Sequence, residues 1–141
     1  MKKGYVFVYG TLMDGFWNYE KHLKPHVIGK WEAWVSGTLY HLREGYPALL
    51  EGDNPVYGNL VQCRQFDKAI AILDRLEGYH GPGHTNLYER ITKAVFLHDG
   101  EVFEAFTYVY SPARLHEVEK FGILIPSGSW REYIEERKAV K

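Results

Sequence analysis

The segment AIAILDRLEGYHGPGHTNLYER, residues 69–90, combines a helical pattern, a loop rich in glycine and proline, and the first residues of a strand. Ile70, Leu73 and Glu77 follow one another at spacings of three and four, so they share one face of the predicted helix. Asp67, just upstream, is a residue type that caps helix N-termini. The spacing therefore predicts one carboxylate, that of Glu77, on the apolar side of the helix at its end.

The position of Glu77 gives its carboxylate two unfavourable surroundings. Gly78 is a residue type that commonly follows a helix end, which places Glu77 near the negative end of the helix dipole. Burial and the dipole both disfavour the charged form and should raise its pKa, which makes Glu77 a candidate general base near neutral pH. The structural alternative is a glutamate that is exposed, or paired with a nearby arginine such as Arg90.

The overall composition limits the function classes. With 141 residues, the chain is predicted to form one domain over residues 1–141. A formal net charge of −1 argues against nucleic acid as a partner. No apolar run reaches membrane length and the N-terminus lacks the pattern of a signal peptide, so no membrane contact and a cytoplasmic location are expected. Cys63, the one cysteine, is expected to be a small core residue.

The N-terminal part predicts a strand followed by a glycine turn. Residues 4–9 are rich in β-formers and are predicted to form a central strand. In the loop Tyr9-Gly10-Thr11-Leu12, free main-chain N–H groups would be able to cradle a carboxylate or phosphate. The alternative is an ordinary turn from a strand into the short helix predicted over residues 16–23, which should stop at Pro25.

The middle of the chain predicts further strands. Residues 27–40 read as one or two strands, and residues 51–55 as a loop by composition. Residues 56–63 form a strand pattern in which Gly58 marks a kink or a close approach of the backbone.

The C-terminal half predicts an antiparallel hairpin and helices. Strands Tyr88–Leu97 and Val102–Tyr110 flank an Asp-Gly turn. A short helix over Leu115–Phe121 and a polar helical tail over residues 131–138 follow. Short strands with few crossovers and two or three helices predict an α+β fold with a curled sheet or a small barrel.

Two loop features have both functional and structural interpretations. Residues 80–86 directly follow Glu77 and form either a lid over a site or a plain surface loop. His80 and His84 are separated by Gly-Pro-Gly, which forbids a helix between them, and His22 and His26 are interrupted by a proline. Neither pair has a dependable metal geometry, so no metal site is predicted.

Short motifs run nearly from end to end of the chain in a specific order: Tyr9-Gly10-Thr11-Leu12, Gly37-Thr38-Leu39-Tyr40, Tyr46-Pro47-Ala48, Val56-Tyr57-Gly58, Leu73-Asp74-Arg75-Leu76-Glu77-Gly78-Tyr79, Tyr88-Glu89-Arg90, Tyr108-Val109-Tyr110 and Ile125-Pro126-Ser127-Gly128-Ser129-Trp130. Through them the chain resembles the γ-glutamylcyclotransferase-like family, also called AIG2-like. The C-terminal Ser-Gly-Ser-Trp departs from the family's more usual Gly-Asp-Trp.

The resemblance implies a small mixed β-barrel with flanking short helices. It implies that Tyr9, Gly10, Thr11 and Leu12 hold the γ-glutamyl moiety of a small-molecule substrate, with Glu77 as catalytic acid/base. The reaction would release 5-oxoproline by attack of the substrate's α-amine on its own γ-carbonyl, and it needs no cofactor. Tyr88 and Tyr110 are further candidates for orienting the substrate or Glu77, with packing as the alternative for each.

Two other function classes compete with the enzyme. One is a non-catalytic small-molecule-binding or regulatory module on the same fold, which would have no need for a carboxylate at Glu77. The other is phosphate or nucleotide binding at Gly10, which is weaker because the loop lacks a glycine-rich phosphate signature and a following lysine. The sequence leaves the leaving amine and the oligomeric state open.

Overall fold

The computed structural model describes residues 4–139. The strands in this range are β1 (Tyr5–Val8), β2 (Val27–His41), β3 (Pro47–Cys63), β4 (Tyr88–Leu97), β5 (Val102–Tyr110) and β6 (Ile123–Leu124). They are ordered β3-β1-β5-β4-β2-β6, and β3 also pairs with β2, which closes five strands into a barrel. The pairing of β1 with β5 is parallel and the others are antiparallel. The predicted small mixed barrel is confirmed.

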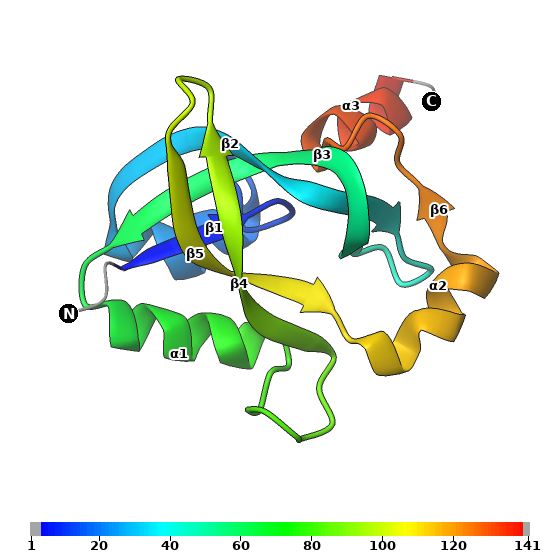
Figure 1. Ribbon diagram of the computed structural model, residues 1–141, viewed down its shortest axis with the longest axis horizontal. Coiled ribbons are helices and arrows are strands. Elements are labelled where there is room, and N and C mark those ends of the chain that lie inside the picture. Colours follow the sequence, from blue (N-terminus) through cyan, green and yellow to red (C-terminus); the bar gives the residue numbers. More distant parts are fainter. Residues whose placement is uncertain (1–3, 140–141) are drawn as a thin grey trace.

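The helical segments flank this barrel. They are η1 (Tyr19–Leu23), η2 (Lys24–His26), α1 (Phe66–Leu76), η3 (Pro112–Arg114), α2 (Leu115–Phe121) and α3 (Trp130–Ala139). Figure 1 shows α1 below the barrel and α2 and α3 toward the right of the view. None of the helices within residues 4–139 is long and apolar enough to cross a membrane.

Pro25 does not end the first helical segment as predicted. A π-helical turn, η1, is followed directly by the 3₁₀ turn η2, and Pro25 lies in the first turn of η2. A proline fits there because main-chain N–H groups in the first turn of a helix have no partner within the helix. The segment therefore continues to His26, where β2 begins.

Strands β2 and β3 are long and curved, and they form the back of the barrel in Figure 1. The prediction of a loop at residues 51–55 is wrong, because these residues belong to β3. The register between the strands shifts after Gly37, and the hydroxyls of Ser36 and Thr38 donate to carbonyl groups of the bulged part of β3. A bulge of this kind adds extra residues without ending the strand. The polar composition of residues 51–55 is therefore compatible with a bulged strand and does not by itself indicate a loop.

The β4–β5 hairpin has the predicted bounds. Gly100 adopts φ +92° in its turn, and the Asp99 side chain accepts a 2.9 Å hydrogen bond from the main-chain N–H of Glu101. The two strands pair along their whole length, from Tyr88 opposite Tyr110 to Phe96 opposite Val102.

Helix α1 exists as predicted, with a different start. It begins at Phe66, and the cap position is Gln65, which adopts φ 48° and makes no side-chain capping bond. Asp67 is therefore a residue of the first turn and not the N-cap. The apolar face of α1 is buried against the barrel through Ala69, Ile70 and Leu73.

Strand β1 is central, as predicted, because it lies between β3 and β5. Gly58 permits the tight packing of β3 against the end of β1: a Cβ added there would lie 2.1 Å from the carbonyl oxygen of Val8. The chain leaves β1 at this point and enters the loop that contains Gly10.

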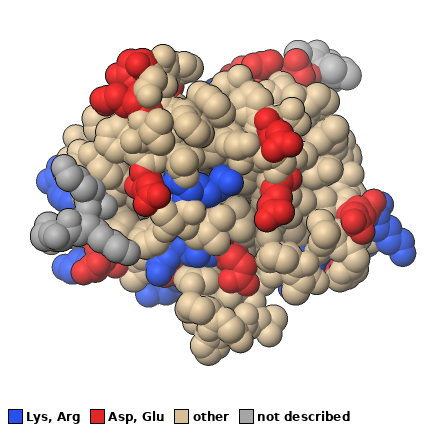
Figure 2. All heavy atoms as spheres, in the orientation of Figure 1, with Lys and Arg blue, Asp and Glu red and all other residues tan. Residues whose placement is uncertain are grey.

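On the face shown in Figure 2, basic and acidic side chains lie interspersed, which fits the formal net charge of −1.

Candidate active site

The end of α1 fixes the position of Glu77. Glu77 caps the helix with φ −90° and ψ 1°, and Gly78 follows with φ +68°, a conformation that favours glycine. The main-chain N–H of Gly78 donates to the carbonyl of Arg75 (3.3 Å), and that of Tyr79 donates to the carbonyl of Asp74 (2.9 Å). These two bonds form a Schellman motif, which ends the helix at a defined residue.

A cavity of about 310 Å³ lies beside this helix end, the loop after β1 and the first part of β4. Among the described residues that line this cavity, Glu77 is the only charged one. The lining consists of Phe7, Val8, Tyr9, Gly10, Thr11, Leu12, Asn18, Tyr46, Pro47, Leu76, Glu77, Leu87, Tyr88 and Tyr108.

Three tyrosines of this lining, Tyr9, Tyr88 and Tyr108, donate their hydroxyl protons to acceptors other than Glu77. Tyr9 donates a 2.6 Å hydrogen bond to the main-chain carbonyl of Tyr108, and Tyr88 donates a 2.6 Å bond to the carbonyl of Pro47. The hydroxyl of Tyr108 donates to Oδ1 of Asp74 at 2.7 Å. Each tyrosine ring therefore contributes apolar surface to the cavity, while its hydroxyl proton is bound to a carbonyl group or to Asp74.

The carboxylate of Glu77 consequently has little to stabilise its charge. Within residues 4–139 it makes no side-chain hydrogen bond or ion pair; Arg90 binds Asp74 instead, at 2.6 Å. Burial raises the pKa of Glu77 to about 7, because a desolvated carboxylate is disfavoured in its charged form. The alternative pairing of Glu77 with Arg90 is wrong, and the predicted rise in its pKa is present.

The glycine loop forms the facing part of the cavity. A Cβ on Gly10 would lie 2.4 Å from Cγ of Pro47, so the loop packs tightly against the start of β3. Gly10 does not adopt a positive φ; close approach is therefore its role. In the described part of the chain, the main-chain N–H groups of Gly10, Thr11 and Leu12 find no protein acceptor. Buried N–H groups normally have a partner, so these donors are available to a ligand.

The side chain of Thr11 is also prepared to donate. Asn18 Nδ2 donates a 2.8 Å hydrogen bond to the Thr11 hydroxyl oxygen, and both residues line the cavity. Because a hydroxyl has one proton and two acceptor sites, the Thr11 proton remains free to bind an acceptor on a ligand.

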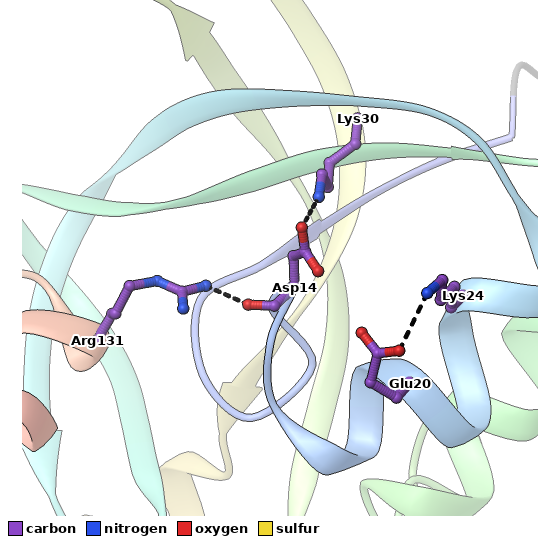
Figure 3. Close-up of polar contacts among 5 residues, drawn as sticks. All are labelled: Asp14, Glu20, Lys24, Lys30 and Arg131. Carbon is purple, nitrogen blue, oxygen red and sulfur yellow. Dashed lines mark hydrogen bonds and ion pairs between the residues drawn. The ribbon is translucent and has the colours of Figure 1, made fainter.

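Figure 3 shows how the rest of this loop is attached to the barrel and to α3. Lys30 of β2 binds the Asp14 carboxylate, and Arg131 of α3 donates to the Asp14 main-chain carbonyl. The hydrogen bond from Lys30 lowers the pKa of Asp14. A separate ion pair, Lys24 with Glu20 at 3.1 Å, lies within the following helical turn. Residues from two segments distant in sequence, β2 and α3, thus hold the chain next to Gly10.

Comparison with known proteins identifies the family. Residues 6–132 match the family model described as gamma-glutamyl cyclotransferase, AIG2-like. The chain belongs to this family. Its members act on small γ-glutamyl substrates, and membership makes this chain a cyclising enzyme of the γ-glutamylcyclotransferase type.

Individual relatives agree with the family match. The chain is 32% identical over 130 residues to a candidate γ-glutamylcyclotransferase of Methanocaldococcus jannaschii, covering 92% of this chain and 97% of that protein. It is 36% identical over 107 residues to the γ-L-glutamyl-butirosin B γ-glutamyl cyclotransferase of Niallia circulans, covering 75% of this chain and 66% of that protein.

Solved structures share the fold. YkqA from Bacillus subtilis superposes with a TM-score of 0.70 at 22% identity, covering 98% of this chain and 43% of that one, so the present chain spans less than half of YkqA. An AIG2-like protein from Mus musculus superposes with a TM-score of 0.63 at 23% identity, covering 82% of this chain and 84% of that one.

The structure brings most of the predicted site residues of this γ-glutamylcyclotransferase-type enzyme together. Glu77, Tyr88 and the loop Tyr9-Gly10-Thr11-Leu12 line the same cavity. Tyr110 is not part of the lining: its ring packs edge-on against Tyr88 at 5.4 Å, and its hydroxyl lies 3.5 Å from Oε1 of Glu117. Tyr110 therefore packs against Tyr88 outside the cavity lining, and the structure does not indicate direct contact between Tyr110 and a substrate.

Several residues at the γ-glutamylcyclotransferase cavity were not predicted as site residues. Tyr108 and Pro47 occur in the motifs that carry the family resemblance, and that was the available signal for them. Asn18 has no signal in the sequence, because its place beside Thr11 depends on the fold of the loop. Within residues 4–139, no group of three or more His, Cys, Asp or Glu side chains is arranged to hold a metal ion.

Proposed function

We propose that this chain releases 5-oxoproline from a γ-glutamyl amine or amino acid, with Glu77 as general acid and base. The observation that carries the proposal is the carboxylate of the half-buried Glu77, with a pKa raised to about 7, in one cavity with the free N–H groups of the Gly10 loop. A carboxylate of this kind can take and return a proton near neutral pH.

The glycine loop would bind the negatively charged oxygens. The N–H groups of Gly10, Thr11 and Leu12 and the Thr11 hydroxyl can donate to the α-carboxylate of the γ-glutamyl group or to the oxyanion of the tetrahedral intermediate. Donors that are already in place need no reorganisation when charge develops. The cavity volume of about 310 Å³ fits a small ligand.

The proposed chemistry is intramolecular. Glu77 takes a proton from the α-ammonium group, and the freed amine attacks the γ-carbonyl carbon to form the ring C–N bond. The ring nitrogen of the tetrahedral intermediate releases its second proton to solvent. The intermediate then collapses as the original amide C–N bond breaks, and Glu77 returns its proton to the departing nitrogen. Nucleophile and electrophile are in one molecule, so the main task is to hold the ring-closing conformation, which contributes roughly 7–11 kcal/mol at best.

The relatives support the γ-glutamyl part of this proposal. The Niallia circulans relative is named for γ-L-glutamyl-butirosin B, and the family name refers to the same acyl group. For this chain we infer that the same γ-glutamyl group enters the cavity, with the leaving amine toward its open side.

The proposal is tested by incubating the protein with several γ-glutamyl amines and γ-glutamyl amino acids. We expect 5-oxoproline and the free amine in equal amounts, measured by mass spectrometry, and a raised melting temperature with 5-oxoproline but not with nucleotides. Binding of γ-glutamyl compounds without any 5-oxoproline would instead indicate a non-catalytic binding module.

A further inference from the structure

Asp74 lies one helical turn before Glu77, so the two carboxylates occupy the same side of α1. Their surroundings differ sharply. Oδ1 of Asp74 accepts the hydroxyl proton of Tyr108 at 2.7 Å, and Oδ2 binds the guanidinium of Arg90 at 2.6 Å. Asp74 thus takes both donors of this region, and Glu77 takes neither.

Arg90 is held in place on the Asp74 side by aromatic rings. Its guanidinium carbon lies 5.1 Å from the ring centre of Tyr79 and 4.7 Å from that of Phe106. The exposed fractions of the Arg90 and Asp74 side chains are 24% and 22%. A cation that is mostly buried in this way interacts more strongly with nearby charges than one in water.

Tyr108 connects this cluster to the cavity, because it lines the cavity beside Glu77 while its hydroxyl is bound to Asp74. The charge of Glu77 acts on the hydroxyls of Tyr9, Tyr88 and Tyr108, which come from the end of β1, from β4 and from β5. Each of these hydroxyls donates to another acceptor. On its own helix, the neighbouring charged groups are Asp74, compensated by Arg90, and Arg75, which is exposed.

We propose that Asp74 is a positioning residue that sets the proton affinity of Glu77, by holding the Tyr108 hydroxyl and the Arg90 guanidinium away from the Glu77 carboxylate. The inference rests on the proposed function of Glu77 as general base, and it deepens that function. Two carboxylates one helical turn apart would then have separate tasks: one organises the donors, and the other remains free to exchange a proton.

The inference predicts two shifts of opposite sign. Asp74→Asn removes the charge that compensates Arg90, so the remaining cation should favour the charged form of Glu77 and lower its pKa. Arg90→Met keeps apolar contact with the rings and leaves the Asp74 carboxylate uncompensated, so like-charge repulsion should raise the pKa of Glu77. General loss of packing would not move the pKa in opposite directions in the two variants.

The experiment is an NMR titration of protein labelled with ¹³C at the glutamate side-chain carboxyl carbons. The Glu77 signal is assigned by its absence in Glu77→Gln, and the exposed Glu104 serves as an internal control. We expect the Glu77 midpoint to fall by about one pH unit in Asp74→Asn and to rise by about as much in Arg90→Met. The Glu104 midpoint should stay the same in both.

An unchanged Glu77 midpoint in both variants, or shifts of the same sign, would overturn the inference and leave Asp74 as a structural residue. If Asp74→Asn does not fold, the direction of the shift in Arg90→Met decides alone. The titration needs no turnover, so the two ideas fail separately. Shifted midpoints without 5-oxoproline release by the wild type would refute the proposed function and leave the control of Glu77 intact.

Discussion

The hydroxyl of Tyr88 donates a 2.6 Å hydrogen bond to the main-chain carbonyl of Pro47. This bond joins the first residue of β4 to the first residue of β3, and the Pro47 ring in turn packs against Gly10. One wall of the cavity is therefore built from three segments that are far apart in the sequence, and the placement of the Gly10 loop depends on them.

Removing the Tyr88 hydroxyl should reduce stability. In Tyr88→Phe the buried carbonyl of Pro47 loses its donor, and an unsatisfied buried acceptor costs about 1–3 kcal/mol of unfolding free energy. Urea unfolding measures this change. Tyr57→Phe is the matched control, because Tyr57 is 41% exposed, and surface changes of this kind usually stay within about 0.5 kcal/mol. Equal losses in the two variants would contradict a specific role for the Tyr88 bond.

The contact between Gly10 and Pro47 can be tested by a pair of substitutions. Gly10→Ala adds a Cβ that would lie 2.4 Å from Cγ of Pro47, so the loop must move. The affinity for 5-oxoproline should therefore fall at least about tenfold, which is equivalent to roughly 1.4 kcal/mol. Pro47→Ala removes Cγ and makes room. Binding measured by calorimetry should therefore recover in part in the double variant, and strictly additive losses would argue against this contact.

The raised pKa of Glu77 predicts how stability depends on pH. Its pKa is about 7 in the folded protein, against a reference value of 4.5, so its contribution to stability is fully present below the unfolded pKa and is lost as the pH rises through the folded one. Glu77→Gln should thus be more stable than the wild type above about pH 8, by an amount on the order of 3 kcal/mol.

Urea unfolding at both ends of the pH range checks this expectation. Below about pH 4 the advantage of Glu77→Gln should vanish, because the wild-type carboxyl is then neutral in the folded and unfolded states. Glu104→Gln should show no such pH dependence, because Glu104 is exposed. An advantage of Glu77→Gln that is the same at both pH values would mean that the ionisation of Glu77 is not its cause.

Arg131 should affect substrate binding more than stability. It donates to the Asp14 carbonyl from α3 and lies over the Phe16 ring at 5.1 Å, so it holds the loop that carries Gly10 (Figure 3). Polar contacts at the surface contribute little to unfolding free energy, about 0–1 kcal/mol. In Arg131→Ala we expect a severalfold higher KM with a nearly unchanged kcat. Arg137→Ala, on the same helix but bonded to Tyr133, should leave KM unchanged; equal effects would contradict the assignment.

Local patterns in the sequence predicted the parts of the fold that local physics decides. The β4–β5 hairpin follows from the Asp99-Gly100 turn, whose glycine adopts φ +92°. The end of α1 follows from Gly78, and the inward position of Glu77 follows from the helical spacing. Each of these depends on residues that are close in sequence.

The parts that could not be predicted depend on contacts between distant segments. The bulge in β3 is fixed by its pairing with β2, and β6 is a strand of two residues that exists only through pairing with the end of β2. Tyr108 and Tyr110 are two residues apart in β5, and only the folded structure shows that Tyr108 lines the cavity and Tyr110 does not.

Turnover by Glu77→Gln tests the central claim most directly. The rate of 5-oxoproline release at saturating γ-glutamyl amine is compared among the wild type, Glu77→Gln and Glu104→Gln, with binding of 5-oxoproline followed by thermal shift to verify that the cavity is intact. Because general acid–base catalysis contributes about 10²–10⁴-fold, we expect at least about a 100-fold loss of turnover in Glu77→Gln, with product binding kept and Glu104→Gln unaffected. Release of 5-oxoproline by Glu77→Gln at the wild-type rate would contradict the account.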